Sequence, residues 1–190
     1  MTHVGRRDLL ALTAGALVLG GCSRLPGVHP AAPTPPPFPD LSRATLTPHQ
    51  RKVLDVLRAE YAAQPPPSRY TPVQGEPWCA DFVSWVERAS GAALRNPHGG
   101  GWRIPGTMTL LEHLRDTRAW HPAGSGYVPV AGDIAIYDHG GSFSQHTNYV
   151  LGLAGGVLTT IGGNEGGRSI RLSSHPFDER LVCLGFGHRG

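Results

Sequence analysis

The hydrophobic pattern of this chain changes period once, near Tyr127, and that change sets the class of fold. Before it, apolar residues recur at intervals of three and four, which predicts helices that begin at Thr47, near Pro77 and at Thr107. After it, short runs rich in β-branched and aromatic residues predict strands over 134–137, 148–153, 157–161, 169–172 and 181–186. Helices first and strands second indicate an α+β fold, with N-terminal helices packed on a C-terminal antiparallel β-sheet.

Two of the predicted helices carry capping-box patterns, in which Ser or Thr is followed three positions later by Glu or Gln. The patterns run from Thr47 to Gln50 and from Thr109 to Glu112. In the second of these helices, the apolar spacing predicts that Met108, Leu111 and Leu114 point inward.

The N-terminal residues carry the marks of export. Arg6 and Arg7 precede an apolar run over 9–19, which is too short to span a bilayer because a spanning helix needs about 20 apolar residues. The run ends in small residues before Cys22 and resembles a bacterial lipobox, which implies a signal peptide over 1–21 and a lipidated Cys22. An ordinary secretory signal remains an alternative. The paired arginines also resemble a twin-arginine signal, so the export route stays open.

Residues 22–43 are rich in Pro and Ala and favour an extended polyproline conformation, which indicates a tether. Residues 44–190 then form one domain of sufficient length for a hydrophobic core. These features predict a protein held by lipid at the outer face of the cell membrane, with its domain facing the cell wall.

Charge and motif content argue against several other classes of function. The net charge is +3 and the arginines are scattered without the basic stripe that nucleic-acid binding favours. The glycine-rich segments 99–101 and 166–167 lack the Lys and Ser/Thr of a phosphate-binding loop, so no cofactor is expected. A zinc site could be assembled from Asp138, His139 and His146, but no second pair of ligands has the usual close spacing, and no metal is expected.

Cys79 is the candidate nucleophile. It falls in the first turn of a predicted amphipathic helix, where the helix N-terminus lowers the pKa of a thiol and favours the reactive thiolate. The alternative is a disulfide between Cys79 and Cys183, since an exported domain lies in an oxidising compartment.

His146 is the candidate base among ten histidines. It opens a predicted strand, so the sheet would hold it while its side chain reaches a helix terminus packed across the sheet. His139 lies in a glycine-rich turn and is less well fixed.

Four segments in sequence order resemble those of CHAP domains, the cysteine, histidine-dependent amidohydrolases and peptidases of the papain-like superfamily. PWCADFVSWV over 77–86 resembles their nucleophile helix, and PVAGDIAIY over 129–137 resembles their Pro-x-x-Gly-Asp strand. HTNYV over 146–150 and TIGGN over 160–164 resemble the histidine strand and the segment that follows it. The last strand, over 184–189, also fits.

The resemblance implies a papain-like α+β fold and hydrolysis of peptidoglycan amide bonds through a thioester. It carries over Cys79 as nucleophile, His146 as general base and acid, and Asn164 as the group that orients the imidazole. Many CHAP domains have Glu two residues before this Asn, where this chain has Gly162. Glu165 is an alternative, but strand alternation puts neighbours on opposite faces, so we expect Asn164 rather than Glu165 to face the ring.

The oxyanion is expected to bind the backbone N–H of Cys79, with Gln74 as a candidate for the second donor. Asp133 is interpreted as structural. Two other functions remain open: a catalytically inactive CHAP-like lipoprotein that binds the wall or docks a partner, and an acyltransferase that uses the same nucleophile and base. The sequence does not identify which amide bond is cut.

Overall fold

Three α-helices precede the sheet in the computed structural model of this chain, which describes residues 35–190. They are α1 (Pro48–Ala63), α2 (Cys79–Ala89) and α3 (Thr107–Asp116), with short 3-10 helices at Pro67–Arg69 and Glu179–Leu181. The predicted signal peptide, Cys22 and most of the predicted tether lie outside the described residues. Within residues 35–190, none of the helices has the length and apolar character needed to cross a membrane.

The strands form a single six-stranded sheet in the order β1-β6-β2-β3-β4-β5, with every pair of neighbours antiparallel. Their bounds are β1 (Trp120–Pro122), β2 (Ile134–Tyr137), β3 (His146–Ala154), β4 (Val157–Glu165), β5 (Ser169–Pro176) and β6 (Cys183–Gly187). The predicted α+β class is confirmed. The sequence does not predict β1, because three residues are too few to show an alternating pattern.

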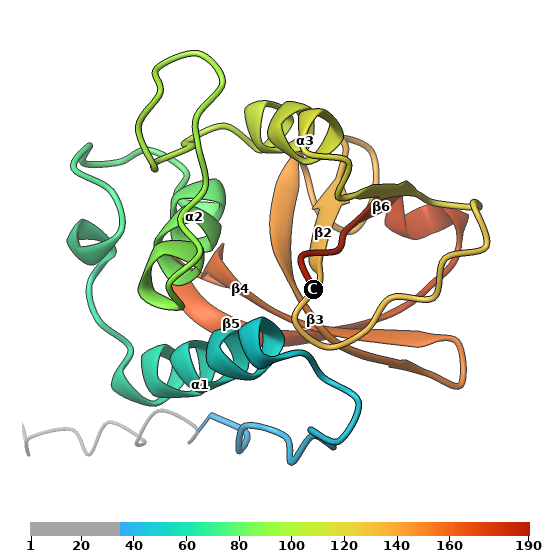
Figure 1. The fold of residues 1–190 in the computed structure, drawn as a ribbon. Helices are drawn as coiled ribbons and strands as arrows, with labels where there is room; N and C mark the ends of the chain where they lie inside the picture. The colour runs from blue at the N-terminus through green and yellow to red at the C-terminus, as the bar shows by residue number, and fades with distance from the viewer. Residues whose placement is uncertain (1–34) are drawn as a thin grey trace, which may run out of the picture. The chain divides into compact units, whose positions relative to one another are not determined.

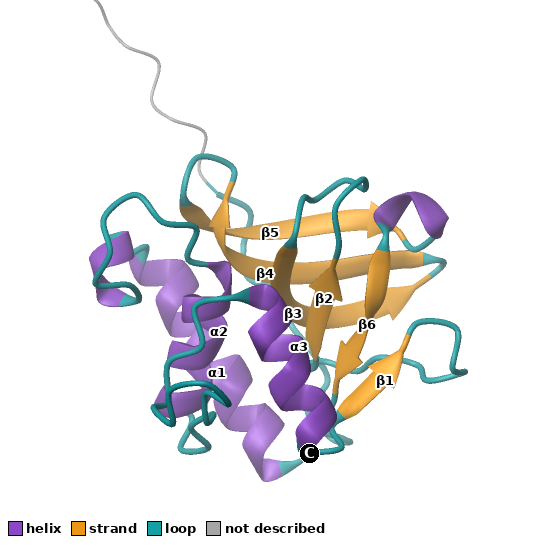
Figure 2. Ribbon diagram, turned by 90° about the horizontal axis from the view of Figure 1, so that it is seen from above, coloured by secondary structure: helices purple, strands orange, loops and turns teal. Residues whose placement is uncertain are grey.

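The helices gather on one face of the sheet, as Figures 1 and 2 show. Successive residues of β2 belong to two different apolar clusters, one on each face of the sheet, because side chains alternate between the faces of a strand. Ile134 and Ile136 belong to the larger cluster, which includes the buried faces of the helices. Ala135 and Tyr137 belong to the smaller cluster on the other face. The sheet is therefore buried on both sides near its centre, where β2 and β3 lie.

Helices α1 and α3 both begin where the sequence predicts, but only α1 has the predicted cap. Thr47 caps α1, and the capping box with Gln50 is complete. Helix α3 begins at Thr107 after Gly106, which gives no side-chain cap, so the capping box predicted at Thr109 is wrong. Met108 is also wrongly predicted to point inward: it is 41 % exposed, because the buried face of α3 runs through Leu110, Leu111 and Leu114.

The folded unit starts at Pro36, within the predicted tether. The Tyr61 hydroxyl donates to the carbonyl of Pro36 at 2.7 Å, and the rings of Phe38 and Tyr61 pack with centroids 6.1 Å apart. Arg43 forms an ion pair with Asp55 at 2.6 Å. Residues 36–43 are thus part of the domain, because Phe38 and Leu41 pack against the larger apolar cluster.

Asp133 is a structural anchor, as the sequence indicated. Its buried carboxylate accepts hydrogen bonds from the backbone N–H of Val130 at 2.9 Å and from the Tyr127 hydroxyl at 2.7 Å. Its second oxygen lies 2.8 Å from Nδ1 of His188. These contacts tie the segment before β2 to the segment after β6.

Gly163 provides a test of how closely α2 packs on the sheet. A Cβ at this position would overlap with the ring of Trp78 and lie 2.7 Å from Cβ of Phe82, both of which are fully buried. We expect Gly163→Ala to lower the free energy of unfolding by about 1–3 kcal/mol, because overpacked rigid rings cannot move aside. Chemical denaturation of the purified variant measures this loss.

Gly152→Ala is the matched control, since Gly152 also lies in a strand but has no neighbouring atom within 4 Å of an added Cβ. Its denaturation midpoint should stay close to that of the wild type. Equal midpoints for the two variants would contradict the packing described here.

Candidate active site

Helix α2 places Cys79 at its first residue. The side chain is only 4 % exposed, and its sulfur lies 3.7 Å from the hydroxyl of Thr107. The hydroxyl of Tyr149 in β3 donates to the carbonyl of Val83 in α2 at 3.2 Å. This bond holds the helix against the strand that begins at His146, so the helix start and the strand start meet.

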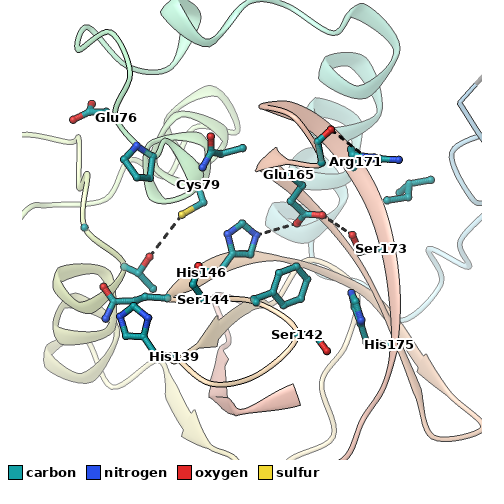
Figure 3. Close-up of a pocket in the computed structure, with 18 of the residues that line it drawn as sticks. Glu76, Cys79, His139, Ser142, Ser144, His146, Glu165, Arg171, Ser173 and His175 are labelled. Atoms are coloured by element: carbon teal, nitrogen blue, oxygen red, sulfur yellow. Dashed lines mark hydrogen bonds and ion pairs between the residues drawn. The ribbon is translucent and has the colours of Figure 1, made fainter. Parts of the chain in front are cut away.

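His146 is the first residue of β3 and lies between Cys79 and Glu165, as Figure 3 shows. Its Nε2 is 3.0 Å from Oε1 of Glu165, and its other ring nitrogen lies on the side of Cys79. The structure therefore brings Cys79 and His146 together, as the sequence predicted.

Asn164, the predicted partner of the imidazole, is not the residue that contacts it. The prediction is corrected by the contact with Glu165. Asn164 has a φ of 62° and lies where the pairing of β4 with β5 shifts register, between Gly162 and Glu165. The irregularity resets the alternation of side chains, so that Glu165 turns toward the ring. A bulge of this kind leaves no mark in a single sequence.

The carboxylate of Glu165 fills the space beside Gly162. A Cβ on Gly162 would overlap with Oε1 of Glu165 and lie 2.7 Å from Cβ of Asn148. Glu165 also accepts hydrogen bonds from Ser173 at 2.5 Å and from Asn148 at 3.3 Å. One signal was available in the sequence, because Glu165 is the only acidic residue between Val157 and Phe177.

The three side chains change one another's ionisation. Burial alone would lower the pKa of His146, but hydrogen bonds and charge attraction with Cys79 and Glu165 raise it to about 9. Burial alone would raise the pKa of Cys79, yet His146, the Thr107 hydroxyl and the backbone N–H of Thr147 together lower it. The pKa of Glu165 is also lowered, since the effect of burial is outweighed by hydrogen bonds from His146 and Ser173. The pair is therefore poised as thiolate and imidazolium.

The pKa of Cys183 is shifted in the opposite direction from the pKa of Cys79. It is a free thiol, as is Cys79, so the disulfide alternative is not what the structure shows. Burial raises the pKa of Cys183 to about 11, opposed only by a hydrogen bond with the Gly185 backbone. The two cysteines are thus chemically distinct, and the thiolate belongs to Cys79.

Phe143 covers the imidazole. Its ring stacks on that of His146 with centroids 4.8 Å apart and planes inclined by 19°, and it meets the ring of His175 edge to face. The aromatic ring therefore shields one face of the imidazole from water.

Cys79 and His146 open into a cleft of about 930 Å³. Its lining includes the start of α3, the loop before β3, and β5; among the lining residues are Glu76, Thr107, His139, Ser142, Asn164, Glu165, Arg171, Ser173 and His175. Gln74 is exposed and is not among the lining residues, so it is not positioned as the second oxyanion donor. Within residues 35–190, no group of acidic, His and Cys side chains is arranged to hold a metal ion.

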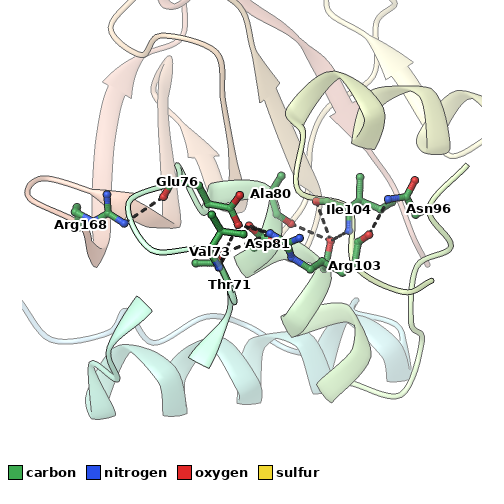
Figure 4. A network of polar contacts seen from close by, with 10 residues as sticks. Thr71, Val73, Glu76, Ala80, Asp81, Asn96, Arg103, Ile104 and Arg168 are labelled. Carbon is green, nitrogen blue, oxygen red and sulfur yellow. Dashed lines mark hydrogen bonds and ion pairs between the residues drawn. The ribbon is translucent and has the colours of Figure 1, made fainter. Parts of the chain in front are cut away.

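Polar contacts fix the segment that leads into α2 from two sides, as Figure 4 shows. Arg103 pairs with the buried Asp81 at 2.5 Å and also with Glu76. Burial raises the pKa of Asp81 to about 6, against the opposing effect of Arg103. From the other side, Arg168 donates to the carbonyls of Gly75 and Glu76, each at 3.1 Å. The backbone before Cys79 is therefore held between the loop that carries Arg103 and the β4–β5 turn.

Fold and site together define a class of protein: an α+β domain with a cysteine at a helix start, a histidine at a strand start and a carboxylate behind it. The sequence model described as the CHAP domain matches residues 71–164, a range that contains Cys79 and His146. This match supports the CHAP domain predicted from the sequence.

A comparison with curated proteins finds no match. Among solved structures, the crystal structure of Ly7917 is similar with a TM-score of 0.47 and 19 % identity, covering 73 % of this chain and 62 % of that one. The crystal structure of Ly7917 with the hydrolyzing product of MDP gives a TM-score of 0.44 and 21 % identity, covering 74 % and 63 %. This chain therefore spans less than two thirds of the length of those structures.

The pKa shifts predict which cysteine reacts with an alkylating reagent. Cys79 should be modified rapidly at pH 7, with an apparent pKa below the usual thiol value, because the imidazolium of His146 stabilises its thiolate. At that pH only about one Cys183 in 10,000 is a thiolate, given its pKa of about 11. Peptide mapping after alkylation at a series of pH values measures both rates.

His146→Ala removes the cation while Cys79 stays buried. The apparent pKa of Cys79 should then rise above the usual value, and its alkylation at pH 7 should slow sharply. An unchanged rate in this variant, or faster labelling of Cys183 than of Cys79, would contradict the ion pair.

Proposed function

We propose that this domain is a cysteine amidase or endopeptidase that cleaves amide bonds in the peptide part of peptidoglycan. The observation that carries the proposal is the arrangement of Cys79, His146 and Glu165 at the floor of an open cleft. The match to the CHAP domain over residues 71–164 supports the class of substrate. Glu165 takes the orienting role that the sequence analysis gave to Asn164.

The reaction would proceed in two acyl-transfer steps. The Cys79 thiolate attacks the amide carbonyl carbon, and the tetrahedral intermediate collapses as the imidazolium of His146 gives its proton to the leaving amine. The acyl group remains on sulfur as a thioester. Neutral His146 then takes a proton from water, the hydroxide attacks the thioester, and release of the carboxylic acid restores the thiolate and the imidazolium.

The site also offers donors for the developing oxyanion. The backbone N–H of Cys79 is among the first of α2 and has no intrahelical acceptor, so it is free to donate to a substrate oxygen. The hydroxyl of Thr107 lies 3.7 Å from the sulfur and replaces Gln74 as the candidate for the second position.

Two observations favour an enzyme over the inactive wall-binding module. Cys79 is a free thiol in a cleft rather than half of a disulfide. The pKa of His146 is raised and that of Cys79 is lowered, so the buried pair favours its charged forms, as is typical of a nucleophile and its base.

The test is to incubate the purified protein with peptidoglycan in H₂¹⁸O and to analyse the soluble products by mass spectrometry. Hydrolysis predicts new amines and one ¹⁸O atom in each new carboxyl group, whereas transfer to an amine acceptor incorporates none. Protein alkylated at Cys79 is the control and should release nothing. Wall left intact by protein whose Cys79 is demonstrably reactive would refute the proposal.

Export and lipid anchoring belong to the same proposal. They are supported by the apolar run over 9–19 and the small residues before Cys22. Incorporation of labelled fatty acid into the expressed protein, and its loss in Cys22→Ala, is the expected result; equal labelling of the variant would contradict the anchor.

A further inference from the structure

Among the charged side chains of residues 35–190 that line the cleft, the carboxylates have protein partners and one arginine has no ion-pair partner. Its two carboxylates are both bound to protein groups: Glu165 to His146 and Ser173, and Glu76 to Arg103. Arg171 also lines the cleft, and among the described residues it forms no ion pair. The cleft therefore presents one guanidinium whose charge has no protein partner.

Arg171 lies on the same face of β5 as the site. It pairs with Gly162 across the strands, and Ser173, the next residue on that face, donates to Oε2 of Glu165. Residues two apart on a strand are separated by about 7 Å. Arg171 is thus one position along this face of β5 from the residue that binds the carboxylate of Glu165, and Figure 3 shows the three residues among those that line the pocket.

Gly166 holds the side chain of Arg171 in place. A Cβ on Gly166 would overlap with Nη1 and Cδ of Arg171, so the arginine lies directly against this glycine. Its Nη1 donates to the carbonyl of Gly166 at 3.3 Å. A guanidinium has five N–H donors, so most remain available to a ligand in the cleft.

We propose that Arg171 binds a free carboxylate of the substrate, so that the substrate class is peptides with a carboxylate close to the cleaved amide bond. A planar fork of N–H donors matches a carboxylate in a two-point hydrogen bond. The inference rests on the proposed function only in taking this cleft as the place where the peptide binds. It makes Arg171 a specificity-determining residue.

The experiment measures binding rather than turnover. Isothermal titration calorimetry is performed on Cys79→Ala, which has no nucleophile, with two wall stem-peptide fragments. They differ only at one γ-linked glutamate residue, whose α-carboxylate is free in one fragment and a carboxamide in the other. The carboxylate fragment should bind about 10- to 100-fold more tightly, as expected for hydrogen bonds to a charged group.

Adding Arg171→Gln to this variant should make the two affinities equal. Arg171→Lys should retain part of the preference, since it keeps the charge but loses the fork. Arg115→Gln is the matched control, because Arg115 is exposed on α3 outside the cleft, and it should leave the preference unchanged.

Equal affinities of Cys79→Ala for the two fragments, no binding of either, or a preference that survives Arg171→Gln would each overturn the inference. None of these results depends on catalysis, which the wall-digestion experiment tests separately. Carboxylate recognition can therefore fail while hydrolysis is observed, and the reverse can also occur.

Discussion

Cys79→Ala should lower kcat/KM for wall-peptide hydrolysis by at least about 10⁴-fold, since removing the nucleophile of a covalent mechanism removes both of its chemical steps. The substitution takes away one sulfur atom at the start of α2 and leaves the hydrophobic contacts of the helix in place. Stability should therefore change little, and a chemical denaturation curve establishes this. The rate is measured from amines released by wall fragments.

Cys183→Ala is the matched control for this loss. Cys183 lies in β6 beside the smaller apolar cluster and is not among the residues that line the cleft. Its variant should retain activity within a few-fold of the wild type. If Cys79→Ala kept substantial activity, the nucleophile would have to be sought elsewhere, and loss of activity in Cys183→Ala alone would point to the second thiol.

Glu165→Gln should lower kcat by about 10²- to 10⁴-fold, whereas Asn164→Ala should change it only a few-fold. The glutamine keeps the size of the side chain and loses the charge that stabilises the imidazolium of His146. Asn164 is the adjacent residue and the one that the sequence favoured, which makes it a direct control. Steady-state kinetics of both variants on one substrate shows whether Glu165 or Asn164 supports the rate.

The pH profile separates an orienting role from a merely structural one. The active ion pair exists above the lowered pKa of Cys79 and below the pKa of His146, which is about 9. Glu165 raises the pKa of His146, so Glu165→Gln should lower it and move the alkaline limit of activity to lower pH. Asn164→Ala should leave that limit in place. An unshifted alkaline limit in Glu165→Gln would contradict the assignment.

Gly162→Ala should also lower kcat, because the added methyl group would displace the carboxylate of Glu165 from His146. Its Cβ would occupy the position of Oε1 of Glu165 and push the carboxylate away from the ring. The expected result is a fall in kcat together with slower alkylation of Cys79, because the imidazolium loses its partner.

The positions of Cys79 and His146 could be predicted from the sequence because each residue lies at the end of a regular element. Proline and the apolar stripe mark where α2 begins and place Cys79 in its first turn. The run of β-branched and aromatic residues marks β3 and places His146 at its start. Local signals were sufficient for both positions, although they did not give the distance between the two side chains.

Glu165 could not be predicted, because its orientation depends on an irregularity in the pairing of β4 with β5. Side chains alternate between the two faces of a regular strand, but the alternation is interrupted where Asn164 adopts a φ of 62°. Similarly, the folded unit includes Phe38 because of its contact with Tyr61, which composition alone does not reveal in a proline-rich segment.

The replacement of an acidic side chain at Gly162 by one at Glu165 has a consequence for how such domains are classified. A comparison that scores position 162 for an acid would label this protein a pseudoenzyme. Yet the carboxylate oxygen lies where a side chain from position 162 would begin, and it contacts the same imidazole. The presence of a carboxylate at such a site is therefore better judged from its spatial position than from the alignment column that supplies it.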